Sequence, residues 1–262
     1  MITVAIPVLN QFHHANNAIK SFKSNQVHEN YYYVMDNGST TPFEHKQINT
    51  INHYKENKGL PFVMNEVLKE ERKLGEREYV LFTHSDVLMH EHRWDEITEQ
   101  AIKEAGNVGV AGYYGALGMG SVEIYKQPYA MHQLARQRPI AGVKCELDAR
   151  VHGQTQFSEL FHPCVVLDGF ALIVKVDSDL WFWNESIHHN YDQDICLESI
   201  DRGYQNIVIN LAVDHLGGQT DVNEDWVKGT NKSKSDIHAE SHIPLYEKWK
   251  PGNRRITLPY WA

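Results

Sequence analysis

The sequence has little cysteine, a deficit of basic residues and no long hydrophobic run. Three cysteines among 262 residues, Cys145, Cys164 and Cys196, are too few and too scattered for a disulfide framework, and their spacing fits no zinc site. Acidic residues outnumber basic residues by 34 to 25, and the net charge of −9 argues against a nucleic-acid partner held through its phosphates. No apolar stretch approaches the roughly 18 residues of a membrane-spanning helix, and the N-terminus begins directly with a strand pattern. We therefore expect a cytoplasmic protein with no signal peptide, no integral membrane segment and no nucleic-acid partner.

What is present is the composition of a folded α/β protein. Hydrophobic residues make up 42% and charged residues 23%, so the chain is neither disordered nor fibrous. In the first half, short β-rich runs alternate with amphipathic segments, which predicts a mostly parallel sheet joined by crossover helices. The predicted strands are 2–8, 31–35, 51–54, 79–83 and 108–113, and the predicted helices are 14–24, 60–74 and 94–105.

The second half is less regular. Asp168-Gly169 lies in the middle of a predicted strand, where a glycine indicates a bulge or a close backbone approach. Residues 127–156 have a poor pattern, and we expect a mobile or hairpin-like insertion there. The other predicted elements are a strand over 163–174, a helix that ends at Arg202, a strand over 205–213 that leads to His215, and a helix that ends at Trp249.

The stretch that organises the chain is the predicted strand 79–83 and the polar triplet after it, His84-Ser85-Asp86. Ligands of open α/β sheets bind at the carboxyl ends of the strands. An acid with a histidine two residues earlier suits a divalent cation or a phosphate-bearing ligand. The alternative is an ordinary turn in which Asp86 caps the next helix.

Seven further segments extend this pattern in order along the chain. They are Ile6-Pro7-Val8-Leu9-Asn10, Asp36-Asn37-Gly38-Ser39, Asn57-Lys58-Gly59, Asp168-Gly169, Asp192-Gln193-Asp194, His215 and Glu247-Lys248-Trp249. With these motifs the chain resembles the family 2 glycosyltransferases of the GT-A fold. The resemblance implies a single domain with a Rossmann-like, mostly parallel central sheet flanked by helices and a smaller acceptor-side region. Its parts would be a nucleotide-sugar-binding half (1–113), an acceptor and catalytic half (114–226) and a C-terminal tail with a helix (227–262).

The resemblance also implies a donor site for a nucleotide-diphosphate sugar. Asp36 resembles the acid that accepts a hydrogen bond from the base, and an acid suits the imide N–H of uracil, which favours a UDP-sugar. The alternative for Asp36 is a residue that stabilises the turn. The alternative for Asn57 and Gly59 is an ordinary turn. The donor-binding residues implied are Pro7, Val8, Asn10, Asp36, Asn57, Gly59, Ser85, Asp86, Asp168 and Gly169.

For catalysis, the resemblance implies a cation held by Asp86 and His215 and a general base at Asp192. The cation would be Mn²⁺ or Mg²⁺, and the histidine favours Mn²⁺. Two positions depart from the family pattern: His84 replaces its first acid, and Tyr191 replaces the glutamate before the base. The alternative for Asp192, or for its neighbour Asp194, is to cap the helix that follows.

The function implied is an inverting, metal-dependent transfer of one sugar to a hydroxyl acceptor, such as a glycan. The chain lacks the Gln-x-x-Arg-Trp motif of processive relatives, which favours a single addition. A non-catalytic nucleotide-sugar or glycan-binding module is the alternative, motivated by the two departures. A nucleotidyltransferase is disfavoured because no glycine-rich phosphate loop follows the first strand. The sequence carries no information on the oligomeric state.

Overall fold

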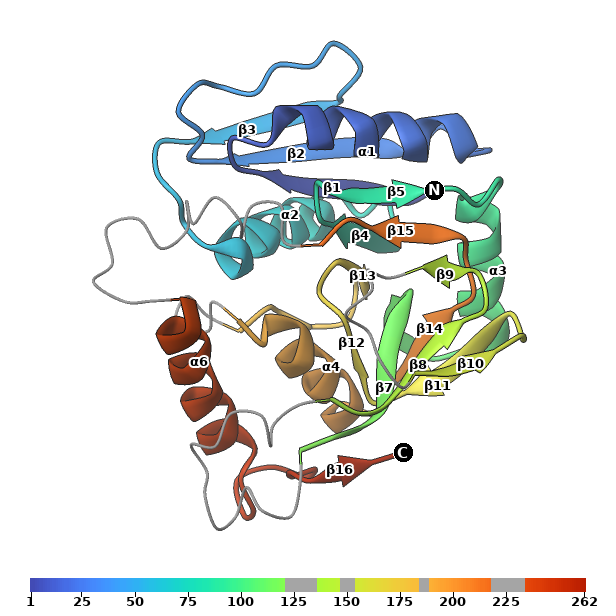
Figure 1. The fold of residues 1–262 in the computed structure, drawn as a ribbon, viewed down its shortest axis with the longest axis vertical. Helices are drawn as coiled ribbons and strands as arrows, with labels where there is room; N and C mark the ends of the chain where they lie inside the picture. Colours follow the sequence, from blue (N-terminus) through green and yellow to red (C-terminus); the bar gives the residue numbers. More distant parts are fainter. Residues whose placement is uncertain (121–135, 147–153, 184–188, 218–233) are drawn as a thin grey trace.

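A computed structural model describes residues 1–120, 136–146, 154–183, 189–217 and 234–262. Its largest sheet has eight strands in the order β11-β14-β6-β13-β4-β1-β2-β3 (Figure 1). In this sheet β13 and β11 run antiparallel to their neighbours, and all other strands run in one direction. The predicted α/β class is confirmed, with a mixed sheet. The strands are β1 (Thr3–Val8), β2 (Tyr31–Asn37), β3 (Thr50–Tyr54), β4 (Tyr79–Thr83), β6 (Val108–Gly112), β11 (Phe161–Cys164), β13 (Ala171–Lys175) and β14 (Gln205–Ile209).

Helices cover both faces of this sheet, so its central strands, such as β1, β4 and β6, are buried on both sides. Alternate residues along β4 point to different cores: Val80 and Phe82 pack with α2 and α4, whereas Leu81 packs with α1 and α3. Strands buried on both faces are continuous hydrophobic runs, which is why they could be found in the sequence. The helices in the described residues are α1 (Phe12–Asn25), α2 (Leu60–Leu74), α3 (Trp94–Ala105), α4 (Tyr191–Asp201) and α6 (Lys234–Trp249). In this part of the chain, every helix is too short or too polar to span a bilayer.

Two smaller sheets flank the large one. A three-stranded sheet has the order β5-β15-β9, and a five-stranded sheet has the order β10-β8-β7-β12 with β16 paired to β7. Their strands are β5 (Val87–Met89), β7 (Tyr114–Met119), β8 (Arg136–Gly142), β9 (Cys145–Glu146), β10 (Thr155–Phe157), β12 (Val166–Leu167), β15 (Val213–His215) and β16 (Tyr260–Trp261). The described part of the expected 127–156 insertion therefore contains strands, and β8 pairs antiparallel with β7 as in a hairpin. The rest of that insertion lies outside the described residues.

Two segments that were predicted to be single strands are each divided into shorter strands. The segment 205–213 is not one strand, because the chain turns at Asn210 between β14 and β15. The buried Asn210 side chain accepts a hydrogen bond from the Lys144 amide (3.2 Å) and donates to the Glu159 carbonyl (3.3 Å). The segment 163–174 is likewise divided among β11, β12 and β13, which belong to two different sheets. Contacts from distant segments made these breaks, so local pattern did not reveal them.

A buried carboxylate in the first turn of α3 fixes this helix to the chain that follows α1. Asp95 is fully buried and accepts hydrogen bonds from the amides of Val27 (3.0 Å) and His28 (2.8 Å) and from the side chain of Asn30 (2.9 Å). Burial acts to raise the pKa of Asp95, but these donors outweigh it and hold the pKa below its ordinary value.

We expect Asp95→Asn to lower the free energy of unfolding by about 2 kcal/mol at pH 7, because an amide turns one donor toward those N–H groups. A depressed native pKa stabilises the fold above the unfolded-state pKa of about 3.9, and this stabilisation is lost as the pH falls through the native value. In urea titrations the difference in unfolding free energy between the wild type and the variant should therefore become smaller below about pH 4. Asp177→Asn, at an exposed position, is the control. If the difference in unfolding free energy stayed constant with pH, the stabilising role of the ionised Asp95 would be contradicted.

Candidate active site

The donor-side motifs lie together at the carboxyl ends of β1, β2 and β3. Asn10, in the left-handed region at φ 59°, follows β1. Its amide donates to the Ser39 hydroxyl (3.0 Å), and its side-chain oxygen accepts from the Thr40 amide (2.8 Å). The motif at the end of β1, which includes Pro7 and Val8 of the strand itself, is thereby joined to the motif at the end of β2.

The loop after β3 is fixed to the same edge. The Asn57 side-chain oxygen accepts from the Asn37 side chain (2.9 Å) and from the Gly59 amide (2.9 Å). Gly38 has φ 91°, and a Cβ there would lie 2.5 Å from the Asn57 nitrogen, so the close approach of the two loops requires glycine. The structure therefore brings together the segments predicted to bind a nucleoside.

Asp36, the acid predicted to face the base, is buried between these loops. Its carboxylate accepts from the amides of Ser39 (3.2 Å) and Phe43 (2.8 Å) and contacts the His53 ring (3.0 Å). Burial acts to raise the pKa of Asp36, but these donors lower it below its ordinary value, so the group is ionised at neutral pH. These contacts are those of the turn-stabilising alternative; contact with a base stays a prediction.

The triplet after β4 contributes to a possible cation site. His84, Asp86 and His215 each offer one ligand atom, and these atoms lie within 4.8 Å of one another. His215 reaches Asp86 because β15 pairs antiparallel with β5, which places His215 opposite Val87. The His215 ring stacks on Phe170, with ring centroids 4.8 Å apart. Two imidazoles and a carboxylate are a donor set that suits a divalent first-row metal, so the residues fit the implied ion.

Of the triplet, His84 is a candidate ligand beyond the Asp86 and His215 that the resemblance implies. Burial lowers the pKa of His84, which leaves a neutral imidazole, the form that binds metal, at neutral pH. Ser85 and Asp86 are buried beside it, at 7% and 6% exposure. Asp86 therefore does not lie in a solvated turn.

Next to this group, two acids share one arginine. Arg136, at the start of β8, donates to Asp168 (2.9 Å) and to Asp192. Asp192 also accepts from the Gly169 amide (2.9 Å) and from its own neighbour's amide, at Gln193 (2.8 Å). The predicted base is thus held in one orientation.

The environment separates the pKa values of these two acids. Burial raises the pKa of Asp192 above its ordinary value, and the charge of Asp168 adds to this against the pull of Arg136. For Asp168, burial acts in the same direction, but Arg136 and His215 outweigh it and the pKa is lowered. An acid with a raised pKa is the stronger base of the two, which suits proton abstraction by Asp192.

The capping alternative for the start of α4 is not what the structure has. Asn190 is the N-cap residue, and its side chain makes no capping hydrogen bond. Asp194 instead accepts from Lys248 (2.7 Å) and from the Trp249 ring nitrogen (2.7 Å), both in α6. The Glu247-Lys248-Trp249 motif therefore acts by fixing α6 to the helix that carries Asp192.

Sequence reasoning missed the role of Arg136 and the contact between His84 and Tyr191. It paired His84 with Asp86 as suited to a cation, and otherwise treated both residues as departures from a pattern. Arg136 lies in the poorly patterned insertion, and no local signal distinguishes it from a solvated arginine. The contact between His84 and Tyr191 joins positions 107 residues apart. The one signal in the sequence that could have indicated this contact is that both residues replace an acid of the family pattern.

The comparisons with solved structures concern the fold. S. aureus TarS, a family 2 GT-A glycosyltransferase, superposes with a TM-score of 0.53 at 17% identity, over 82% of this chain and 36% of TarS. The chain has the GT-A fold. Crystal structures of TarS 1–349 alone and in complex with UDP-GlcNAc also match this GT-A chain at 17% identity, with TM-scores of 0.53 and 0.51. They cover 94% and 80% of it, and the match spans 71% and 56% of those chains. No protein-family model and no curated protein sequence matches.

Proposed function

We propose that this protein is an inverting, metal-dependent glycosyltransferase that moves one sugar from a nucleotide-diphosphate sugar to a hydroxyl acceptor. The observation that carries the proposal is the convergence of a cation-ligand group with a buried acid of raised pKa. Tyr191 and His84 both lie within electrostatic reach of Asp86, Asp168 and Asp192, so the two predicted functional acids belong to one cluster. This cluster adjoins the loops at the carboxyl ends of β1 to β4, on a GT-A fold.

In this proposal Asp192 is the general base. Its carboxylate takes the proton of the acceptor hydroxyl while that oxygen forms a bond to the anomeric carbon. The bond from the anomeric carbon to the diphosphate oxygen breaks on the opposite side, so the configuration inverts and the bonding electrons leave with the diphosphate. Arg136 and the Gly169 amide hold the base in place for this transfer.

Asp86, His215 and His84 would hold the divalent cation, Mn²⁺ or Mg²⁺, next to the diphosphate. When bound, the ion neutralises the charge that develops on the departing diphosphate. Asp168 is within electrostatic reach of His84 and His215, and the Gly169 amide donates to Asp192. Both residues would contact the donor sugar. A UDP-sugar is the favoured donor, because Asp36 is ionised and because TarS has been crystallised with UDP and with UDP-GlcNAc.

The test is a thermal-shift panel of nucleotide sugars with Mn²⁺, with Mg²⁺ or with EDTA, followed by an assay for released nucleoside diphosphate. A ligand that binds the folded state raises the unfolding temperature. We expect a metal-dependent shift with UDP-sugars and slow, metal-dependent release of UDP. Binding without release in the presence of any hydroxyl acceptor would instead support the non-catalytic module, which the substitutions at His84 and Tyr191 motivate.

A further inference from the structure

The two positions that depart from the family pattern contact each other. His84, directly after β4, and Tyr191, the first residue of α4, place ring nitrogen Nε2 and hydroxyl oxygen Oη 3.1 Å apart. The Tyr191 hydroxyl also donates to the Gly169 carbonyl (3.4 Å). The substitutions are therefore one structural unit rather than two independent losses of a carboxylate.

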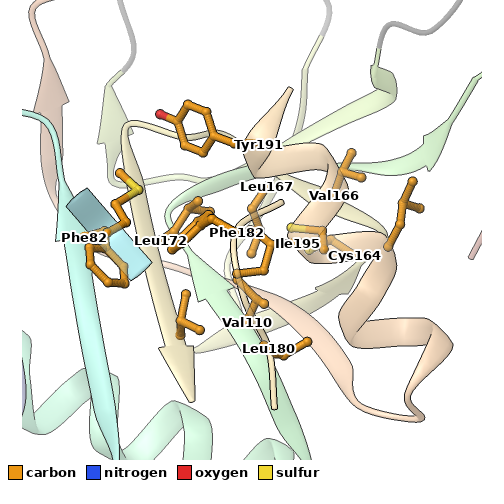
Figure 2. Close-up of a cluster of buried hydrophobic side chains, with 14 of the residues drawn as sticks. Phe82, Val110, Cys164, Val166, Leu167, Leu172, Leu180, Phe182, Tyr191 and Ile195 are labelled. Carbon is orange, nitrogen blue, oxygen red and sulfur yellow. The ribbon is translucent and has the colours of Figure 1, made fainter. Parts of the chain in front are cut away.

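Tyr191 has little freedom to leave this position. Its ring is 6% exposed and packs edge-on to Phe182, with centroids 6.0 Å apart. Figure 2 shows the ring at the border of the apolar cluster and the hydroxyl directed away from it. A Cβ on Gly169 would lie 2.6 Å from the Tyr191 hydroxyl oxygen and 3.0 Å from the ring carbon that carries it. Gly169 therefore leaves room for the Tyr191 ring and hydroxyl beside His84.

The two contacts of the Tyr191 hydroxyl are compatible with a form of the histidine that leaves one ring nitrogen for the ion. A hydroxyl that donates its proton to the Gly169 carbonyl has its lone pairs left to accept from Nε2–H of His84. A neutral imidazole with its proton on Nε2 carries its free lone pair on Nδ1. Metal-binding histidines are held in the same way, with one ring nitrogen on the ion and the other donating to a fixed acceptor.

We propose that Tyr191 is a positioning residue that orients His84 as the third protein ligand of the cation, and that the resulting two-histidine, one-aspartate site selects Mn²⁺ over Mg²⁺. Mg²⁺ prefers oxygen ligands in near-ideal octahedral geometry, whereas imidazole nitrogen favours first-row transition ions. Replacing the usual acid by His84 exchanges an oxygen donor for a nitrogen donor in the group with Asp86 and His215. This inference rests on the cation site of the proposed function and specifies its ion.

The experiment measures metal binding to the protein without donor or acceptor. Isothermal titration with MnCl₂ and with MgCl₂ gives the affinities, and pulsed EPR of the Mn²⁺-loaded protein counts the coordinated ¹⁴N nuclei. We expect tighter binding of Mn²⁺ than of Mg²⁺ and two histidine nitrogens in the wild type. Tyr191→Phe, which removes only the hydroxyl, should weaken Mn²⁺ binding by about 10–100-fold. His84→Asp should leave one nitrogen coupling and reduce the preference for Mn²⁺.

Tyr204→Phe and His162→Asp are the controls, since they make the same chemical changes at positions away from the group. Equal affinity of the wild type for both ions, one nitrogen coupling in the wild type, or unchanged Mn²⁺ affinity in Tyr191→Phe would each overturn the inference. UDP-sugar turnover supported equally by Mg²⁺ would sink the ion selectivity but leave the proposed function intact. If the protein bound Mn²⁺ as expected but bound no nucleotide sugar, the proposed function would be contradicted and the ion selectivity would stand.

Discussion

Asp192→Asn is expected to lower turnover by about 10³-fold while the affinity for the nucleotide sugar stays close to that of the wild type. The amide cannot take the proton of the acceptor hydroxyl, but it keeps the size of the carboxylate and still accepts from the Gly169 amide. Because burial raises the pKa of Asp192, wild-type turnover should increase with pH through that raised value, and the variant should lack this increase. Steady-state kinetics over a pH series, with the donor affinity taken from calorimetry, measures both effects.

The same raised pKa predicts the stability of this variant. An acid whose native pKa exceeds its unfolded value stabilises the fold below the unfolded pKa, and this contribution is lost as the pH rises through the native value. At neutral pH the asparagine variant should therefore unfold at the same temperature as the wild type or above it. Asp201→Asn, the same change in the same helix but outside the cluster, is the control for activity. Wild-type-like turnover in Asp192→Asn would remove this residue from the mechanism.

Asp86→Ala is expected to lower the affinity for Mn²⁺ by at least about 100-fold, because it removes the one anionic ligand of the group. The loss should extend to the nucleotide, since a diphosphate bound through the ion loses its anchor. Titration of UDP into the variant should then give the same weak affinity with Mn²⁺ as with EDTA. The wild type should differ strongly between these two conditions.

The control for this substitution lies on the neighbouring strand. Asp214 precedes His215 in β15, is paired opposite Leu88 and contacts the exposed His90 ring (2.8 Å). Asp214→Ala removes a carboxylate from the strand that carries His215 without touching the ligand set, and should retain both affinities. If Asp86→Ala kept the Mn²⁺ dependence of UDP binding, the cation site would have to lie elsewhere.

Much of the first half of the fold could be predicted because its signals are local. Helix α2 has the predicted bounds, and Gly75 ends it in the left-handed conformation with its amide on the Glu71 carbonyl (2.9 Å). Strands β1, β2 and β4 are largely apolar runs, whereas β3 is short and half-exposed. The ends of all four gather at one edge of the sheet because the strands run parallel. Local periodicity and backbone preference were sufficient for these elements.

The second half was predicted less well because its boundaries depend on distant partners. The break at Asn210 is made by contacts with Lys144 and Glu159, and no residue near Asn210 indicates it. The role of Arg136 depends on the pairing of β8 with β7. Arg136 and Asp192 are 56 residues apart in the sequence, although their side chains are in contact. Side-chain contacts of this range carry no periodic signal in the sequence.

By itself the sequence determined the fold class and which side chains stand at the ends of the strands, since backbone preference and apolar period act within a few residues. Only the tertiary structure decided which of those side chains meet. It joined His84 to Tyr191 and placed Arg136 between two acids, because hydrogen bonds and charges act over a few ångströms in space regardless of separation along the chain.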